Sequence, residues 1–290
     1  ELVVYDDKQS AEEAANVAEQ IVANDDIVAV IGHHVSTCSM AAAPIYQDHG
    51  MLEVSPCSSH ADFTAIGNWI WRVSPLSSDE ALSVSKFVVS YWDAKKVGIL
   101  VMNSDWGLDI SELETEYLKE LNPNIEIVTE YTVEGNDDYG PIVTNFKNAG
   151  VDTIICAATY TMTAPFSKQM RAAVPEINLI AHCNCQVSQV TDILGADGDE
   201  FTCSASWSPT FTDDETKYYL EKYKEMDAND TTPTGEFAQY YDTMGVLLQA
   251  CKNAGSFDRE AICKELADIE YTGLSGILNF DEKRDCPRDY

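Results

Sequence analysis

The sequence has no long hydrophobic run and few basic residues, and both absences exclude classes of protein. No apolar stretch approaches the about 18 consecutive residues that predict a membrane-spanning helix. The 290 residues include 18 Lys and Arg against 49 Asp and Glu, a formal net charge of −31. A field of that sign repels nucleic acids and anionic lipid surfaces, so we expect no nucleic-acid partner. The acidic residues are dispersed along the chain and indicate a solubilising surface.

The signatures of several common enzyme classes are also missing. The chain has no Gly-x-Ser-x-Gly, no phosphate-binding P-loop and no Gly-x-Gly-x-x-Gly after a predicted strand. A nucleophile built from Cys38 with His33 or His34 has no recognisable third group to orient it. We therefore predict a binding protein, not an enzyme, and no cofactor.

The cysteines follow no known pattern. Their number, nine, is odd, and their spacing matches neither a zinc finger nor a small disulfide framework. Cys156, Cys203 and Cys251 lie in apolar runs, where a reduced cysteine behaves as a small core residue. This usage favours a reducing or anaerobic setting.

Apolar strands alternate with helical patterns along the chain. Capping boxes at Ser10/Glu13 and Ser77/Glu80 predict two helix starts. Short apolar runs predict strands at 27–32, 51–56, 97–102, 125–133, 151–160 and 177–184, and the opening ELVVYDD also reads as a strand. The run at 27–32 is continuously apolar, which is typical of a strand buried on both faces of a parallel sheet. The alternation predicts a doubly wound α/β fold, in which ligands bind at the carboxyl ends of the strands.

The length predicts two domains or lobes. The pattern restarts near residue 77, and the joins near Pro75 and Trp207 are short. We expect one discontinuous lobe from 1–76 and 207–290 and a second lobe from 77–206, with connecting segments that act as a hinge.

The order of these stretches resembles a known family. DDKQSAEEAANVAEQIVANDDIVAVIG, MLEVSP, WRVSP, VMNSDWG, YGPIVTNFKNAGVDTII, YYDTMGVLLQA and GLSGILNFDEKRD follow one another as in the type I periplasmic binding proteins. The most similar group is the branched-chain amino-acid (Leu/Ile/Val) binding proteins of ABC importers. The resemblance implies two α/β lobes with a ligand cleft between them, and we expect the family's first and last strands to lie outside this sequence.

The resemblance also implies a function. An extracytoplasmic monomer, in the periplasm or attached to the cell surface as a lipoprotein, would bind an amino acid, an amide or a related small polar solute. Closure of the two lobes would trap the ligand, and the protein would present it to an ABC permease in the membrane. A sensory or receptor ligand-binding domain of the same fold is the alternative.

Two polar turns carry the implied ligand site of the first lobe. In the family, a serine after the strand at 27–32 holds the ligand's α-carboxylate at a helix N-terminus, and Ser36 matches it here, with Thr37 beside it. The turn SPCSSH implies a second ligand loop, in which Cys57, Ser58 and Ser59 contact the ligand. Taken without the resemblance, such serines are ordinary helix caps.

Trp106 and Tyr160, with Thr159 as a rival for Tyr160, match the aromatic positions of the second lobe; packing is their alternative role. One position departs from the family. Leu/Ile/Val binders place a glutamate for the ligand's ammonium where this chain has Cys183, and a thiol cannot replace that charge at neutral pH. Asp105 and Glu236 are the alternative ammonium partners.

A metal site is the remaining alternative. His33, His34, His182, Cys183 and Cys185, together with Cys38 and Cys57, follow predicted strands and carry ligands suited to zinc or copper. Their spacing matches no metal signature, so we expect no metal at the main site. A Cys183–Cys185 disulfide is a further hypothesis.

Overall fold

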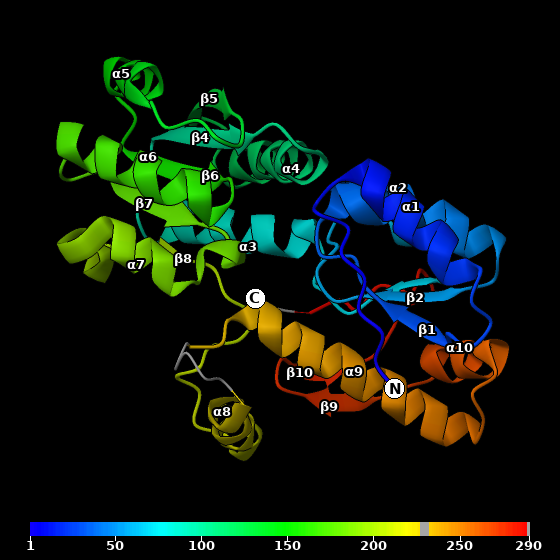
Figure 1. Cartoon of the computed structure of the whole chain (residues 1–290). Helices are drawn as coiled ribbons and strands as arrows, with labels where there is room; N and C mark the ends of the chain where they lie inside the picture. The colour runs from blue at the N-terminus through cyan, green and yellow to red at the C-terminus, as the bar shows by residue number, and fades with distance from the viewer. Residues whose placement is uncertain (227–231, 289–290) are drawn as a thin grey trace. The chain divides into compact units, whose positions relative to one another are not determined.

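The computed structural model describes residues 1–226 and 232–288, and the chain divides into two compact units (Figure 1). Unit 1 contains Glu1–Leu76, Pro209–Met226 and the described residues from Gly235 onward. Unit 2 contains Ser77–Ser208 and, of the later described residues, Thr232–Thr234. The chain therefore leaves unit 1 after Leu76, returns to it at Pro209, and enters unit 2 again before Gly235.

Unit 1 is built on three parallel strands. They are β1 (Ala29–Ile31), β2 (Leu52–Ser55) and β3 (Ile70–Arg72), with β2 in the centre. Every residue of β2 is buried, whereas those of β1 are only half-buried. The run at 27–32 is covered on both faces, since Ala29 and Ile31 pack against one apolar cluster and Val30 against another, but it is less deeply buried than expected. β1 is at the edge of this sheet and pairs only with β2.

Helices cover both faces of this sheet. α1 (Ala11–Val22) and α2 (Ser36–Asp48) share one apolar cluster with Ile70, while α9 (Gly235–Ala254) and α10 (Arg259–Ala267) share another with Val54. The remaining elements of unit 1 are η1 (Thr64–Ile66), α8 (Asp214–Met226) and the antiparallel pair β9 (Tyr271–Gly273) and β10 (Gly276–Leu278). The start of α1 is as predicted, since Ser10 Oγ accepts the N–H of Glu13 at 3.5 Å.

The opening segment ELVVYDD is not a strand, contrary to the sequence expectation. A strand needs a hydrogen-bonded neighbour, and no described strand pairs with residues 1–7. Leu2 and Val4 are accordingly exposed, at 72% and 82%.

Unit 2 is built on five parallel strands in the order β5-β4-β6-β7-β8. The strands are β4 (Lys96–Met102), β5 (Glu126–Thr132), β6 (Thr153–Ala157), β7 (Asn178–Ala181) and β8 (Thr202–Cys203). The helices are α3 (Ser77–Ser90), α4 (Asp105–Leu121), α5 (Gly140–Ala149), α6 (Tyr160–Ala173) and α7 (Ser188–Leu194), with the short η2 (Cys183–Cys185) and η3 (Gly195–Glu200).

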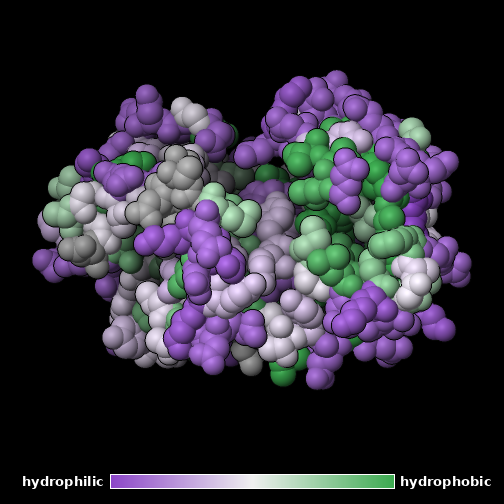
Figure 2. Space-filling model, turned by 60° about the horizontal axis from the view of Figure 1, so that its bottom comes forward, coloured by the Kyte–Doolittle hydropathy of each residue, from purple (hydrophilic) through white to green (hydrophobic). Residues whose placement is uncertain are grey.

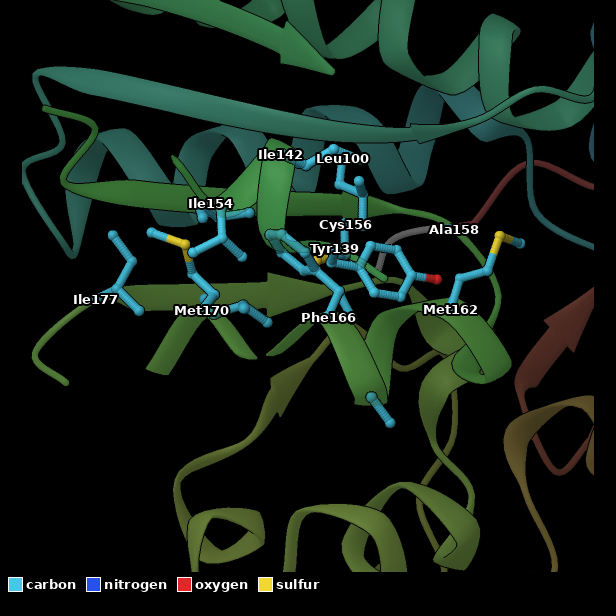
Figure 3. Close-up of a cluster of buried hydrophobic side chains, with 14 of the residues drawn as sticks. Leu100, Tyr139, Ile142, Ile154, Cys156, Ala158, Met162, Phe166, Met170 and Ile177 are labelled. Atoms are coloured by element: carbon cyan, nitrogen blue, oxygen red, sulfur yellow. The ribbon is translucent and has the colours of Figure 1, made fainter. Parts of the chain in front are cut away.

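Alternate residues of the central strands of unit 2 face opposite layers of helices, as a period of two requires. Leu100 and Cys156 belong to the cluster beneath α5, α6 and α7, where Figure 3 shows side chains such as Tyr139 and Phe166 meeting those of the strands. Ile99 and Ile155 belong to the cluster beneath α3 and α4. Both faces are therefore covered, which explains the continuously apolar runs.

Two strands of unit 2 end earlier than predicted. β6 ends at Ala157, and Tyr160 is the first residue of α6 with Thr159 as its N-cap. β7 ends at Ala181, so His182 lies in the turn that leads into η2. These side chains therefore belong to the polar turns that follow the strands.

One face of the molecule is rich in hydrophilic residues (Figure 2). Figure 2 shows hydrophilic residues over much of one face, with hydrophobic residues gathered in part of it at the right of the view. Among the helices of the described ranges, none has the length and apolar character needed to cross a membrane.

A buried ion pair joins distant parts of unit 1. Arg72, at the end of β3, is fully buried, and its Nε donates to Asp285 Oδ1 at 2.6 Å. Asp285 Oδ1 also accepts the hydroxyl of Thr64 at 2.8 Å. Nη1 of Arg72 donates to the carbonyls of Ser58 and His60, at 3.3 and 2.6 Å. The guanidinium thus holds the loop after β2 against the end of β3.

A buried imidazole joins three parts of unit 2. His182 is fully buried between two carboxylates, with Nε2 2.7 Å from Glu114 Oε1 and Nδ1 3.3 Å from Glu80 Oε1. Burial alone would lower the pKa of His182, but the two carboxylates outweigh it and raise the pKa to about 10. Burial would likewise raise the pKa of Glu80, but the facing imidazolium lowers it to about 2, whereas burial dominates at Glu114 and raises the pKa of that carboxyl.

Replacing Asp285 with Asn should lower the free energy of unfolding by about 3–5 kcal/mol, because the guanidinium of Arg72 would stay buried without a counter-charge. Urea denaturation measures this change. Glu282→Gln, at an exposed position three residues away, is the control and should stay within about 0.5 kcal/mol of the parent. An Asp285→Asn loss no larger than the control's would contradict the stabilising role of the pair.

The stability of the protein should fall as the pH rises from 6.5 to 10. The pKa of folded His182 is about 10 against an ordinary 6.5, so the folded chain holds a proton that the unfolded chain releases in this window. The free energy of unfolding should decrease by up to about 1.4 kcal/mol per pH unit, measured by urea denaturation across this range. The His182→Gln variant should lose most of this slope below about pH 8, because at higher pH buried thiols with raised pKa values, such as Cys57 and Cys156, add a slope of the same sign. An unchanged slope below about pH 8 would show that another group causes it.

Candidate functional site

The first candidate contact is the start of α2, directly after β1. Ser36 is the first residue of the helix and is nearly buried, and the N-cap residue, Val35, makes no side-chain capping bond. The hydroxyl of Ser36 lies 3.5 Å from that of Ser58, which donates to it from the neighbouring turn. The structure therefore brings the two predicted polar turns together, at the positive end of a helix dipole.

The loop after β2 is held by Ser55, the last residue of that strand. Its Oγ donates to the carbonyl of His33 at 3.0 Å and accepts the N–H of Ser58 at 2.9 Å. From the other side, Nη1 of Arg72 donates a hydrogen bond to the carbonyl of Ser58. Ser58 is thus fixed from both sides, and the half-buried Cys57 and Ser59 flank it along the chain. Thr37, next to Ser36 on α2, is also half-buried.

The start of α9 contributes further polar groups on the same unit. The thiol of Cys57 lies 3.6 Å from Gln239 Oε1, and Glu236 Oε2 lies 3.8 Å from His34 Nε2. The ring of Tyr240 stacks on His34 with centroids 6.2 Å apart. Burial, with a smaller effect of the Glu236 charge, raises the pKa of Cys57 well above its ordinary value, so this thiol is neutral.

On unit 2, Trp106 lies in the first turn of α4. It is half-buried and packs against the apolar cluster beneath α3 and α4. Its ring meets that of His182 edge-on, with centroids 5.6 Å apart. Trp106 therefore has both a packing role and a partly exposed surface.

Tyr160 lies in the first turn of α6, after β6. It is half-buried and packs against the cluster beneath α5 and α6. The hydroxyl of its rival, Thr159, lies 2.7 Å from that of Thr161, and both threonines donate to Glu134 Oε2. The hydroxyl of Thr159 is therefore already engaged, and the ring of Tyr160 is the larger partly exposed group of this turn.

Cys183 follows β7 and is half-buried. Its backbone N–H donates to Glu80 Oε1 at 2.8 Å, and its carbonyl accepts the N–H of Gln186 at 3.1 Å. The turn is therefore well fixed. Asp105, one of the two alternative ammonium partners, is exposed at the start of α4 on the same unit, whereas Glu236 belongs to unit 1.

The described residues form no group of three or more His, Cys, Asp or Glu side chains suited to a metal ion. Of the alternative ligands, His33 and His34 belong to unit 1, whereas His182, Cys183 and Cys185 belong to unit 2. The nitrogens of His33 face Asp7 Oδ2 at 2.7 Å and the hydroxyl of Tyr46 at 3.2 Å. Because both nitrogens of His182 face carboxylates, the metal hypothesis finds no support.

No disulfide joins Cys183 and Cys185 in the described part of the chain, so the disulfide hypothesis is wrong. The sulfur of Cys185 is turned to the carbonyl of Ala158 at 3.7 Å and to Asn184 Oδ1 at 3.3 Å.

A cavity of about 830 Å³ in unit 1 lies apart from these residues. It is lined by Trp69, Trp71, Lys264, Phe280 and Arg284 among others, near the amino end of β3. None of the candidate ligand residues lines it, so it is separate from the candidate site.

Sequence reasoning missed three residues that hold these turns. The roles of Arg72 and Glu114 could not be predicted from the sequence, because the residues that pair with them are distant along the chain and come close only in the folded structure. Glu80 was assigned to a helix cap, and its carboxylate has the further role of holding Cys183.

Known proteins share the fold and the order of the elements. A leucine-binding protein, LivK, from Thermotoga maritima has a crystal structure that matches with a TM-score of 0.91 and 26% identity, over 99% of this chain and 81% of that one. A leucine-, isoleucine-, valine-, threonine- and alanine-binding protein of Pseudomonas aeruginosa is 24% identical over 98% of this chain and 75% of its own length. The Leu/Ile/Val-binding protein of Escherichia coli K12 is 26% identical, over 98% of this chain and 76% of its own length.

The sequence model of the periplasmic binding proteins matches residues 1–286, nearly the whole chain. The members of that family bind substrates for transport and are not enzymes. The fold agrees with this match, since both units are doubly wound. The two polar turns that meet at Ser36 and Ser58 agree with it too. This chain therefore belongs to the periplasmic binding protein family.

Proposed function

We propose that this protein binds an amino acid, most simply a branched-chain one, and delivers it to the permease of an ABC importer. Periplasmic binding proteins act outside the cytoplasm, and relatives named for Leu, Ile and Val binding support the ligand class. We further propose that the protein is a monomer in the periplasm or a lipoprotein at the cell surface. The observation that carries the ligand proposal is the pair of serine hydroxyls at the start of α2.

In this proposal, the ligand's α-carboxylate lies at the N-terminus of α2. Helix N-termini favour anions, since their first N–H groups point outward at the positive end of the dipole. Ser36 and Thr37 belong to this first turn, and Ser58 already donates its hydroxyl toward Ser36. Cys57 and Ser59 complete the carboxylate side of the site.

Glu236 is the proposed partner of the ligand's ammonium. It stands on the same unit as Ser36, close to His34 and close enough to Cys57 to affect the pKa of that thiol. Its side chain is 24% exposed, so its carboxylate is accessible yet less hydrated than a fully exposed one. Asp105 lies on the other unit and is more exposed, which makes it the weaker candidate.

The second lobe supplies the other wall of the site in this proposal. The two units are the two lobes of this proposal, and closure brings Trp106, Tyr160 and Cys183 toward the ligand. Affinity then depends on contacts from both lobes, since only the closed state makes all of them.

A thermal-shift experiment with leucine and two analogues tests the ligand proposal. Leucine should raise the melting temperature by several degrees, since a ligand at 100 times its Kd stabilises the native state by about 2.7 kcal/mol. Isopentylamine lacks the carboxylate and 4-methylpentanoate lacks the ammonium, so each should give a much smaller shift. No shift with leucine or with any other common amino acid would contradict the proposal.

Ser36→Ala and Glu236→Gln should weaken leucine binding through different groups. Ser36→Ala removes a hydrogen bond to the charged carboxylate, and Glu236→Gln removes the negative charge that faces the ammonium. Each loss is worth about 1.5–3 kcal/mol, or roughly a 10- to 150-fold increase in Kd by titration calorimetry. Ser36→Ala should leave the weak binding of isopentylamine unchanged, and Glu236→Gln that of 4-methylpentanoate.

Ser39→Ala is the matched control for the serine variant. Ser39 is buried on the same helix, three residues after Ser36, and its hydroxyl donates to the carbonyl of His33 at 3.4 Å. Its Kd for leucine should stay close to that of the parent. Equal losses in Ser36→Ala and Ser39→Ala would remove the special role of Ser36.

A further inference from the structure

One carboxylate in unit 2 contacts two separate segments of the chain. Glu80 lies in the first turn of α3 and is nearly fully buried. Its Oε1 accepts the backbone N–H of Cys183 at 2.8 Å and the hydroxyl of Ser204, and lies 3.3 Å from His182 Nδ1. A buried carboxylate with this many partners holds them in a defined arrangement.

Glu80 and its partner Ser204 lie close to the points where the chain passes between the two units. Glu80 comes four residues after Leu76, where the chain leaves unit 1, and Ser204 comes five residues before Pro209, where it returns. Cys183 is the candidate ligand residue after β7. The carboxylate of Glu80 thus lies where these two connecting segments meet the candidate ligand turn.

A second contact ties the same turn to the returning segment. Gln186 Nε2 donates to the carbonyl of Trp207 at 3.2 Å, and Trp207 is fully buried two residues before Pro209. The N–H of Ser204 also donates to the carbonyl of Ala181, the last residue of β7, at 3.0 Å. The turn and the returning segment are therefore connected at both of their ends.

His182 keeps the carboxylate of Glu80 in place. Its ring is fully buried, its second nitrogen is held by Glu114 at 2.7 Å, and Trp106 covers it edge-on. With a carboxylate at each nitrogen, the ring cannot rotate without leaving a buried charge unpaired.

We propose that Glu80 and His182 are positioning residues that couple the ligand turn Cys183–Cys185 to two of the segments joining the units, the one after Leu76 and the one before Pro209. A shift of the connecting segments during closure would then move this turn, and ligand contact at the turn would favour one arrangement of the segments. Neither residue needs to touch the ligand. The inference deepens the proposed function and rests on it for its link to ligand affinity.

The protonation of this pair is constant across the neutral range. The charges of Glu80 and Glu114 keep His182 protonated up to a pKa of about 10. The other titratable groups facing the carboxylates are the thiols of Cys156 on β6 and Cys203 on β8. Burial raises the pKa of both, that of Cys203 to about 11, so both are neutral there.

Hydrogen exchange of the ligand-free protein tests the coupling directly. In Glu80→Gln, which keeps the shape of the side chain but removes its charge, exchange should become faster together in the turn after β7 and in these two connecting segments. Glu112→Gln, an exposed change on α4, is the matched control and should leave all three unchanged. A change confined to the first turn of α3 would overturn the proposal.

The affinity for leucine provides the second readout. Glu80→Gln should raise the Kd by about 2- to 30-fold, the usual range for a coupling residue. In Glu80→Gln, His182 faces a single carboxylate, so it should lose its proton at a lower pH than in the parent. The loss of affinity that accompanies this deprotonation should move to lower pH as well. His182→Gln has no imidazole to titrate and should not show this loss. An unchanged pH profile in Glu80→Gln would overturn the role of the pair.

The two readouts separate the proposals. If the parent protein binds no amino acid while exchange still changes together in the three segments, the proposed function fails and the coupling stands. If leucine binds and exchange changes only near residue 80, the coupling fails and the proposed function stands.

Discussion

The parallel pairing of short buried strands is the constraint on which the rest of both units depends. A parallel strand can be reached only through a crossover, so every strand is followed by a turn and a helix, and the turns gather at the carboxyl edge of each sheet. Ser36, Ser58, Trp106, Tyr160 and Cys183 all lie in such turns or at the helix starts that follow them. The candidate site is therefore a consequence of the topology.

Buried charges keep these turns in place. Taking a guanidinium or an imidazolium out of water costs free energy, which is offset only where a carboxylate and further hydrogen bonds accompany it. Arg72 meets Asp285 beneath the serine loop, and His182 meets Glu80 and Glu114 beneath the turn after β7. In unit 1, Arg72 also donates to backbone carbonyls of the serine loop. In unit 2, His182 pairs with Glu80, which accepts the backbone N–H of Cys183. These buried ion pairs thus fix the turns in which the ligand contacts are proposed.

The sequence predicts that the chain departs from the family at the ammonium position, and the proposed arrangement differs accordingly. The turn with Cys183 has no carboxylate to offer, since Glu80 is buried and already holds the backbone of that turn. An accessible carboxylate, Glu236, lies on the same unit as the serines. In the proposed arrangement, both ends of an amino acid are held by unit 1 and the second unit contributes mainly aromatic and thiol surface. This division would favour ligands with an apolar side chain.

The sequence alone determined the fold class, the approximate strands and the polar turns that follow them, because hydrophobic periodicity and helix capping are local patterns. The resemblance to the family, and not these local patterns, gave Ser36, Cys57 and Ser58 their predicted contacts with the ligand. The tertiary structure decided that Ser36 and Ser58 meet, that β1 is a half-buried edge strand, and that ELVVYDD is unpaired. It alone showed the partners of the buried groups of Arg72, Glu80, Glu114 and His182. Each partner lies on another element, and pairing between distant elements leaves no local pattern in the sequence.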